Sequence, residues 1–137
     1  MEDINDFFTT LEESGFPSDW YIRSISFMLE SLSLIRHRLH PIAANAFEAA
    51  EQYWKGDSRL VNLEVIQVSC WNYLDTNIAT AHTSEFESAS IRAVTCVIYA
   101  TPPDQDVFEF LSVFSQLTNK IEPHEVEQLQ LLKKHFG

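Results

Sequence analysis

Two pairs of side chains have a spacing that could support chemistry. His37 and His40 lie three residues apart, which would place them on one side of a helix as possible metal ligands. Glu48 and Glu51 share a spacing of the same kind, and two carboxylates can act as general acid and base. The histidines belong to a basic run that suits a solvated helix end, and the glutamates have no accompanying histidine. A small enzyme with a carboxylate-based site therefore remains an alternative, and surface roles are the main expectation.

Known catalytic and cofactor motifs are absent from the sequence. The three glycines, Gly15, Gly56 and Gly137, are too far apart to form a phosphate-binding loop. There is no CxxC, HExxH or GxSxG motif. His124 and Glu127 are also three residues apart, but the E-x-x-H order of di-iron bundles is missing. We therefore expect no catalytic residues, no metal site and no cofactor.

The charge balance favours a basic partner. Acidic residues outnumber basic ones by 20 to 9, and the formal net charge is −11. Such a surface repels the phosphates of nucleic acids and anionic membranes, so neither is expected to bind. It would attract a basic protein and accelerate the encounter. Solubility alone is the alternative explanation of the charge.

Two acidic groups are the candidate contact surface for this partner. Asp104, Asp106 and Glu109 lie at an expected helix start beside Phe108, which falls outside the apolar stripe of that helix. Glu85 and Glu87 lie at the start of the preceding helix. The two starts should lie at opposite ends of antiparallel neighbours, so one common patch is not expected. We rank the Asp104 group first, because three acids fall within six residues beside Phe108. The alternative is that these charges only complement helix dipoles.

The pattern of apolar residues predicts an all-α, single-domain bundle of six to seven mostly antiparallel helices. The 137 residues suit one domain, and the scarcity of glycine and proline argues against an all-β fold. Apolar residues recur at three- and four-residue steps in every segment. The expected helices cover residues 3–13, 19–39, 41–54, 59–75, 85–100, 104–118 and 123–136.

The centre of the predicted fold is a helix hairpin between Ala43 and Asp75. Gly56 can adopt positive φ and end the first helix, and Asp57 and Ser58 can cap the second. Trp54 and Trp71 are expected to close one core. Residues 61–68 are rich in β-branched side chains, so a strand is the alternative there.

The cysteines and the N-terminus indicate the compartment. Cys70 and Cys96 each lie inside an apolar helical pattern, and we expect both to be reduced core residues. The first residues, MEDINDFF, do not resemble a secretory signal, and no apolar run approaches the length of a membrane span. A cytoplasmic location is expected.

The central hairpin resembles a known family. It carries the pattern A-x-x-A-x-x-Y-W-x-G followed by a leucine-containing helix that ends in Cys-Trp, and it looks like helical immunity proteins of bacterial polymorphic toxin systems. The resemblance covers about residues 42–100 and implies an all-helical fold that neutralises a cognate toxin by binding it. It implies no catalytic residues. The residues that carry it are Ala46, Ala49 or Ala50, Tyr53, Trp54, Gly56, Cys70 and Trp71.

The leading hypothesis is therefore a non-enzymatic immunity protein that binds a basic toxin acting in the cytosol. A helical adaptor or regulatory domain that binds a protein of its own cell is the first alternative. The small enzyme with a carboxylate site is the second.

Overall fold

The computed structural model describes residues 3–56, 61–79, 85–102, 104 and 106–137. This part of the chain forms α-helices and one short 3-10 turn and contains no strand, which confirms the predicted all-α fold. The elements are α1 (Ile4–Ser14), α2 (Trp20–Leu34), η1 (Arg36–Arg38), α3 (Pro41–Trp54), α4 (Leu63–Ala79), α5 (Glu85–Thr95), α6 (Val107–Ile121) and α7 (Glu125–Phe136).

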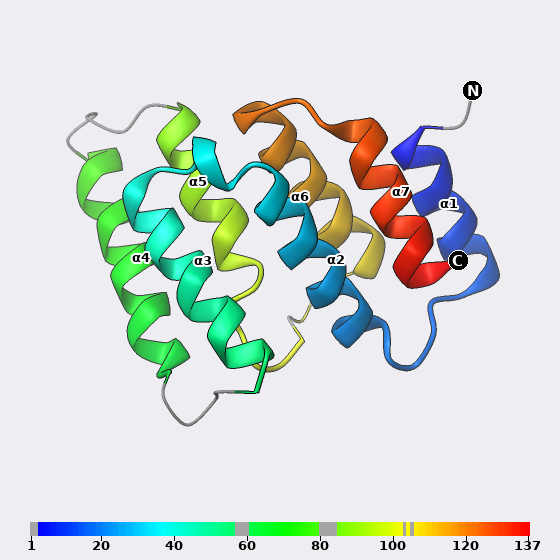
Figure 1. Cartoon of the computed structure of the whole chain (residues 1–137), viewed down its shortest axis with the longest axis horizontal. Coiled ribbons are helices and arrows are strands. Elements are labelled where there is room, and N and C mark those ends of the chain that lie inside the picture. Colours follow the sequence, from blue (N-terminus) through cyan, green and yellow to red (C-terminus); the bar gives the residue numbers. More distant parts are fainter. Residues whose placement is uncertain (1–2, 57–60, 80–84, 103, 105) are drawn as a thin grey trace.

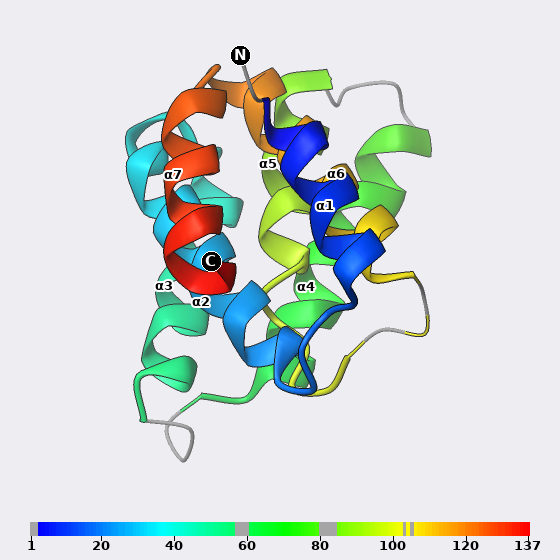
Figure 2. The same ribbon diagram turned by 90° about the vertical axis from the view of Figure 1, so that its right-hand side faces the viewer.

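The helices are arranged in two layers. One layer holds α3, α2 and α7, and the other holds α4, α5, α6 and α1 (Figures 1 and 2). Contacts between the layers join α3 to α4 and α5, α2 to α6, and α7 to α1 and α6. Within the second layer α5 contacts both α4 and α6, so it lies between them. The outer side of this layer carries the candidate site described below.

Several helix ends follow from local sequence, as predicted. Pro41 stands at the first position of α3, where its missing N–H has no helical partner to lose. Gly56 takes φ 114° directly after α3. Asp106 caps α6 by accepting a hydrogen bond from the Glu109 backbone N–H at 3.1 Å.

Other helix boundaries differ from the prediction. The expected helix 19–39 ends at Leu34 and is followed by the 3-10 turn η1. Pro41 accounts for the non-helical backbone of His40, the residue before it. α4 begins only at Leu63, with the Asn62 side chain accepting from the backbone N–H of Glu64. The predicted caps Asp57 and Ser58 lie outside the described residues.

The buried apolar side chains form one cluster that both layers share. Phe8, Phe27, Phe47 and Phe114 are among its fully buried members. Ile22 and Val126 lie at the surface, 57% and 67% exposed. The cysteines are free, as expected: Cys70 is buried and Cys96 is half-buried.

The helix predicted over residues 85–100 is shorter than expected. α5 ends at Thr95, and the chain then continues through Val97 and Ile98 as a non-helical segment whose side chains are fully buried. Because this backbone has left the helix, its carbonyl groups need partners from elsewhere.

Three consecutive backbone carbonyls, of residues 97–99, obtain those partners from three different helices. Each accepts a hydrogen bond from a side chain that is far away in sequence, and the donors come from α3, α4 and α2. The segment thereby ties the two layers together. The bonds run from Trp54 Nε1 to Val97 O (2.8 Å), from Gln67 Nε2 to Ile98 O (2.7 Å) and from Tyr21 Oη to Tyr99 O (2.6 Å).

A second buried polar group centres on Gln128 of α7, which is fully buried. Its amide uses all four of its hydrogen-bonding positions, two as acceptor and two as donor. The partners lie on α2 and α6, so the amide links three helices through their core. Ser115 Oγ and Asn119 Nδ2 donate to Oε1 at 3.0 and 2.6 Å, and Nε2 donates to Ser31 Oγ at 2.8 Å and to Thr118 Oγ1 at 2.7 Å.

His124 extends this network in its neutral form. Its Nδ1 lies 2.7 Å from the Glu122 carbonyl, which can only accept, so Nδ1 carries the proton. Nε2 is then the acceptor for the Ser31 hydroxyl at 3.0 Å. Burial lowers the pKa of His124, while the nearby carboxylates of Glu127 and Glu122 oppose that change in part.

We expect replacement of Gln128 by Leu to lower the free energy of unfolding by about 3 kcal/mol or more, because three buried side chains and the half-buried Asn119 lose their bonds to its amide. Gln130→Leu on the same helix is the matched control, since Gln130 is exposed, and should change stability by less than about 0.5 kcal/mol. Urea denaturation measures both. Equal effects of the two substitutions would contradict the role given to Gln128.

The stability contributed by His124 should depend on pH. Its pKa in the folded state lies below the unfolded value of about 6.5, so the folded state takes up the proton less readily. The contribution of His124 to the free energy of unfolding is complete above about pH 6.5 and is lost progressively as the pH falls. The difference in unfolding free energy between the wild type and His124→Gln should therefore shrink from about pH 7.5 to about pH 5. If this difference stays constant or grows as the pH falls, the lowered pKa assigned to His124 is wrong.

Candidate functional site

The outer side of α4 carries apolar residues that none of the other described helices covers. Val65 and Val68 are 58% and 57% exposed, and Trp71, three residues further on, is 41% exposed. Their spacing places the three on one side of the helix. The opposite side, with Leu63, Cys70 and Leu74, is buried. The prediction that Trp71 closes the core with Trp54 is therefore wrong for Trp71, because α4 has two apolar sides and turns the other one inward.

Trp71 is held in place at the surface by Tyr99. The indole N–H of Trp71 donates to the Tyr99 hydroxyl at 2.7 Å. The Tyr99 backbone is fixed in turn by the hydroxyl of Tyr21. The polar ends of both aromatic side chains are thus satisfied by each other, which leaves their ring surfaces for apolar contact.

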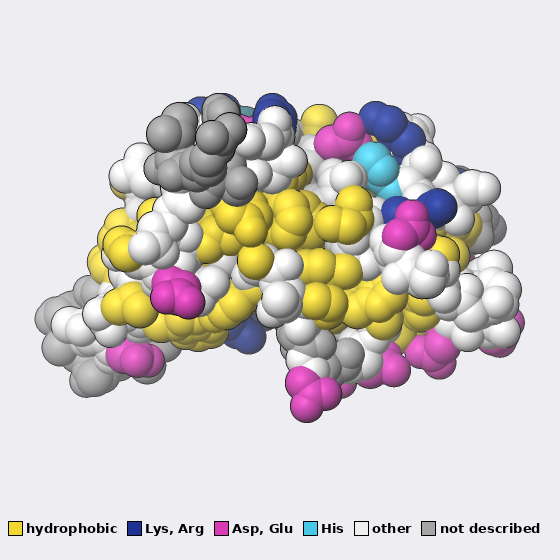
Figure 3. Space-filling model, turned by 90° about the horizontal axis from the view of Figure 1, so that it is seen from below, with side chains coloured by type: hydrophobic (Ala, Val, Ile, Leu, Met, Phe, Trp, Pro, Cys, Tyr) yellow, Lys and Arg dark blue, Asp and Glu magenta, His cyan; other side chains and the backbone are white. Residues whose placement is uncertain are grey.

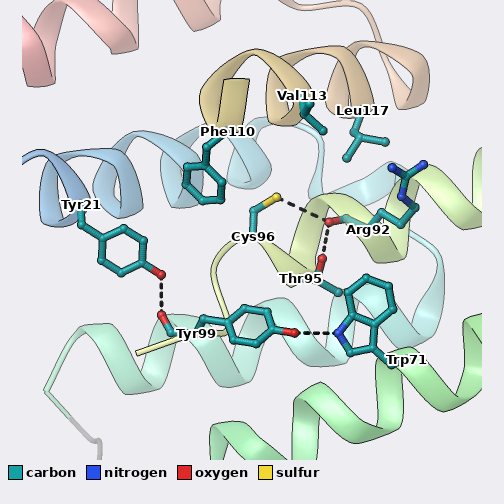
Figure 4. A pocket seen from close by; sticks show the side chains of 9 residues that line it. All are labelled: Tyr21, Trp71, Arg92, Thr95, Cys96, Tyr99, Phe110, Val113 and Leu117. Atoms are coloured by element: carbon teal, nitrogen blue, oxygen red, sulfur yellow. Dashed lines mark hydrogen bonds between the residues drawn. The ribbon is translucent and has the colours of Figure 1, made fainter. Parts of the chain in front are cut away.

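A groove lies beside Trp71, and we call it the α4–α6 groove. It encloses a volume of about 240 Å³. α4 contributes one wall and α6 the other, and the end of α5 forms the floor between them (Figure 4). The lining residues are Tyr21, Trp71, Arg92, Thr95, Cys96, Tyr99, Phe110, Val113 and Leu117.

The residues that line the groove are unreactive, and one of them is a cation. Burial raises the pKa of the Cys96 thiol to about 12 and that of the Tyr21 hydroxyl to about 12, so both are neutral near pH 7. The hydroxyl of Thr95 donates to the Arg92 carbonyl at 2.6 Å and is thereby occupied. Arg92 is exposed and brings the only charge among the lining residues. These groups suit binding of an apolar surface better than nucleophilic chemistry.

The structure keeps the predicted Asp104 group together at the start of α6. Asp104, Asp106 and Glu109 are all exposed. Glu109 precedes Val113 by four residues, so it lies on the same side of α6 as the groove wall. Phe108 is half-buried, and its ring packs edge-on against Phe8 of α1 with centroids 6.0 Å apart. Phe108, the aromatic residue predicted beside these acids, is thus part of the contact between α1 and α6.

The other predicted acidic pair lies elsewhere. α5 begins at the end of the molecule opposite to the start of α6, as Figure 1 shows. Glu87 is half-buried, and its carboxylate accepts a hydrogen bond from the Tyr73 hydroxyl at 3.4 Å. Glu85 stands at the first position of α5, and its side chain lies outside the described part of the structure. The two acidic groups therefore do not form one patch.

The histidine and glutamate pairs whose spacing could have supported chemistry interact with other groups of the protein. His40 caps α3 by accepting from the Ile42 backbone N–H at 3.3 Å, and His37 lies 3.2 Å from a Glu122 oxygen. Arg36 pairs with Glu48 and with Glu51. No cluster of three or more metal-ligating side chains occurs among the described residues.

The end of the molecule that carries residues 96–102 also presents apolar surface. Figure 3 shows hydrophobic side chains in a broad band there, with acidic groups at several points of its margin. One hollow in this region is lined by Ile22, Leu29 and Trp54 together with Glu30 and His135. Tyr99 lines both the α4–α6 groove and a further hollow beside Leu63, so apolar surface continues around this residue.

Sequence reasoning identified the acidic residues at the start of α6, beyond one end of the groove, but not the groove itself. Arg92 and Tyr99 belong to no motif, and they line one groove with Trp71 because α5 packs between α4 and α6.

Comparisons with protein-family models, with curated proteins and with solved structures found no match to this chain. None of the described helices has both the length and the apolar character that crossing a membrane requires.

The different positions of two tryptophans predict different effects on stability. Trp54 packs against the core and donates to Val97 O, and Trp54→Ala should lower the free energy of unfolding by about 3 kcal/mol or more. Trp71→Ala removes a side chain that is 41% exposed and should lower it by only about 1 kcal/mol. Thermal or urea unfolding distinguishes them. A larger loss for Trp71→Ala would show that Trp71 serves the core.

Proposed function

We propose that this chain is a protein-binding domain that neutralises a basic bacterial toxin as an immunity protein, with the α4–α6 groove and the outer side of α4 as its binding surface. The observation that carries the proposal is the exposure of Trp71 with Val65 and Val68 on a helix whose other side is buried. Exposed apolar groups gathered in this way are typical of interaction sites.

The aromatic residues of the groove have the properties of an interface anchor. Trp71 and Tyr99 are joined by a hydrogen bond of 2.7 Å, so little side-chain freedom remains to be lost when a partner binds. Tryptophan and tyrosine are also the residues most often found to carry the energy of binding at interfaces. The groove beside them can receive an apolar side chain of the partner.

The charges favour a basic partner for this surface. Asp104, Asp106 and Glu109 lie at one end of the groove wall, and the whole chain carries a formal net charge of −11. Complementary charge accelerates association and selects against acidic proteins. The resemblance of the central hairpin to helical immunity proteins agrees with a partner of this kind. An adaptor domain would use the same surface, so the identity of the partner separates the two functions.

A rescue experiment tests the proposal. The protein encoded immediately upstream is expected to be toxic when it is expressed, and the cells should survive when the wild-type chain is co-expressed. Val68→Asp, which places a charge on the outer side of α4, should abolish rescue while the protein remains folded. Val126→Asp is the matched control, because Val126 is 67% exposed on α7, and it should rescue fully.

Failure of the wild-type chain to rescue would overturn the immunity function. Rescue by Val68→Asp together with loss of rescue in Val126→Asp would place the binding surface on α7. Circular dichroism of both variants shows whether either has lost its fold.

A further inference from the structure

The α4–α6 groove has opposite charges near its two ends. Arg92 lies toward Leu117 at one end, and Phe110 and Tyr21 lie at the other (Figure 4). Glu109 immediately precedes Phe110 on α6, and Asp106 lies one turn before it. From Glu109 to Leu117 the α6 wall rises by about 12 Å, at roughly 1.5 Å per residue. The groove is therefore basic at one end and apolar along the rest of its length, and the acidic residues at the start of α6 lie beyond its other end.

The guanidinium of Arg92 is available to a ligand. Among the described residues, the salt bridges pair Arg23 and Arg36 with carboxylates, but none involves Arg92, whose side chain is exposed. A guanidinium offers a planar set of donors that matches a carboxylate. A purely basic ligand would leave this group facing a like charge.

The middle of the groove suits one large apolar side chain. Trp71 and Val113 face each other across the Cys96 floor, and the Trp71 and Tyr99 polar atoms are already paired. The surrounding described elements are helices, so they offer no free strand edge to an extended peptide. Docking of a helix is a mode of recognition that suits an apolar groove of this kind.

We infer that the groove binds a helical segment of the partner that carries an acidic residue for Arg92, an apolar residue for the space between Trp71 and Val113, and a basic residue for Glu109 and Asp106. This inference rests on the proposed function and narrows it from a basic protein to a segment of mixed charge. In a helix, a separation of about 12 Å corresponds to about eight residues, so the three groups fall on one side at steps of four.

The helix dipole sets the direction of this segment. Acidic residues are favoured near the start of a helix and basic residues near its end. The bound segment therefore begins near Arg92 and ends near Glu109, so that it runs antiparallel to α6.

Three synthetic helices test the inference without the toxin. Each has blocked ends, a side-chain staple and Leu at the central position. One carries Glu four residues before Leu and Lys four residues after it, and the other two carry Lys at both positions or Glu at both. Fluorescence polarisation at about 50 mM salt, where screening is weak, measures their affinities for the wild type, for Arg92→Glu and for Asp104→Lys/Glu109→Lys. Asp106 is left unchanged because it caps α6.

The wild type should bind the mixed helix about five- to tenfold more tightly than either like-charged helix. Arg92→Glu should prefer the helix with two lysines, and Asp104→Lys/Glu109→Lys should prefer the helix with two glutamates, while Glu12→Lys/Glu13→Lys on α1 keeps the wild-type preference. If the wild type binds the two-lysine helix as tightly as the mixed helix, the inference is overturned. The proposed function then still stands, because a basic partner can bind the groove. Failure of all three helices to bind would also overturn it, and the rescue experiment then decides the proposed function separately.

Discussion

The structure depends on three consecutive backbone carbonyls that α5 leaves unpaired when it ends at Thr95. Burying such groups without partners would be costly, and Trp54, Gln67 and Tyr21 supply the missing donors. Because these donors come from α3, α4 and α2, the same three bonds set where both layers meet. They also fix Tyr99 at the surface, where its hydroxyl holds Trp71. The shape of the groove is thus a consequence of how the core satisfies its polar groups.

The second buried network holds α6, which forms the other wall of the groove, in place. Gln128 and His124 bind side chains of α2 and α6 from α7, so α6 is held from the side that faces away from α4. On the outer side of α4, Trp71 is held by Tyr99, while Val65 and Val68 are exposed and contribute little to the fold. A surface of this kind, with rigid support and exposed apolar groups, suits binding of another protein.

Local sequence accounts for much of the fold. Pro41, Gly56 and Asp106 set helix boundaries by their own backbone preferences, and the all-α fold follows from the apolar spacing. The orientation of α4 could not be predicted, since both of its sides are apolar and periodicity does not say which one meets the core. The early end of α5 could not be predicted either, because the side chains that donate to the carbonyls of residues 97–99 lie up to 78 residues away in sequence. The acidic part of the site was visible as a cluster, whereas Arg92 and Tyr99 join it only through these distant contacts.

The binding role of the groove is tested most directly by the NMR signals of the three tryptophan indole N–H groups, assigned with Trp→Phe variants, as the mixed-charge helix is added. Trp71 and Trp54 both donate hydrogen bonds, but only Trp71 lines the groove. The Trp71 signal should shift with added helix while the Trp54 signal stays in place. A shift of the Trp54 signal with no change at Trp71 would show that the helix binds elsewhere.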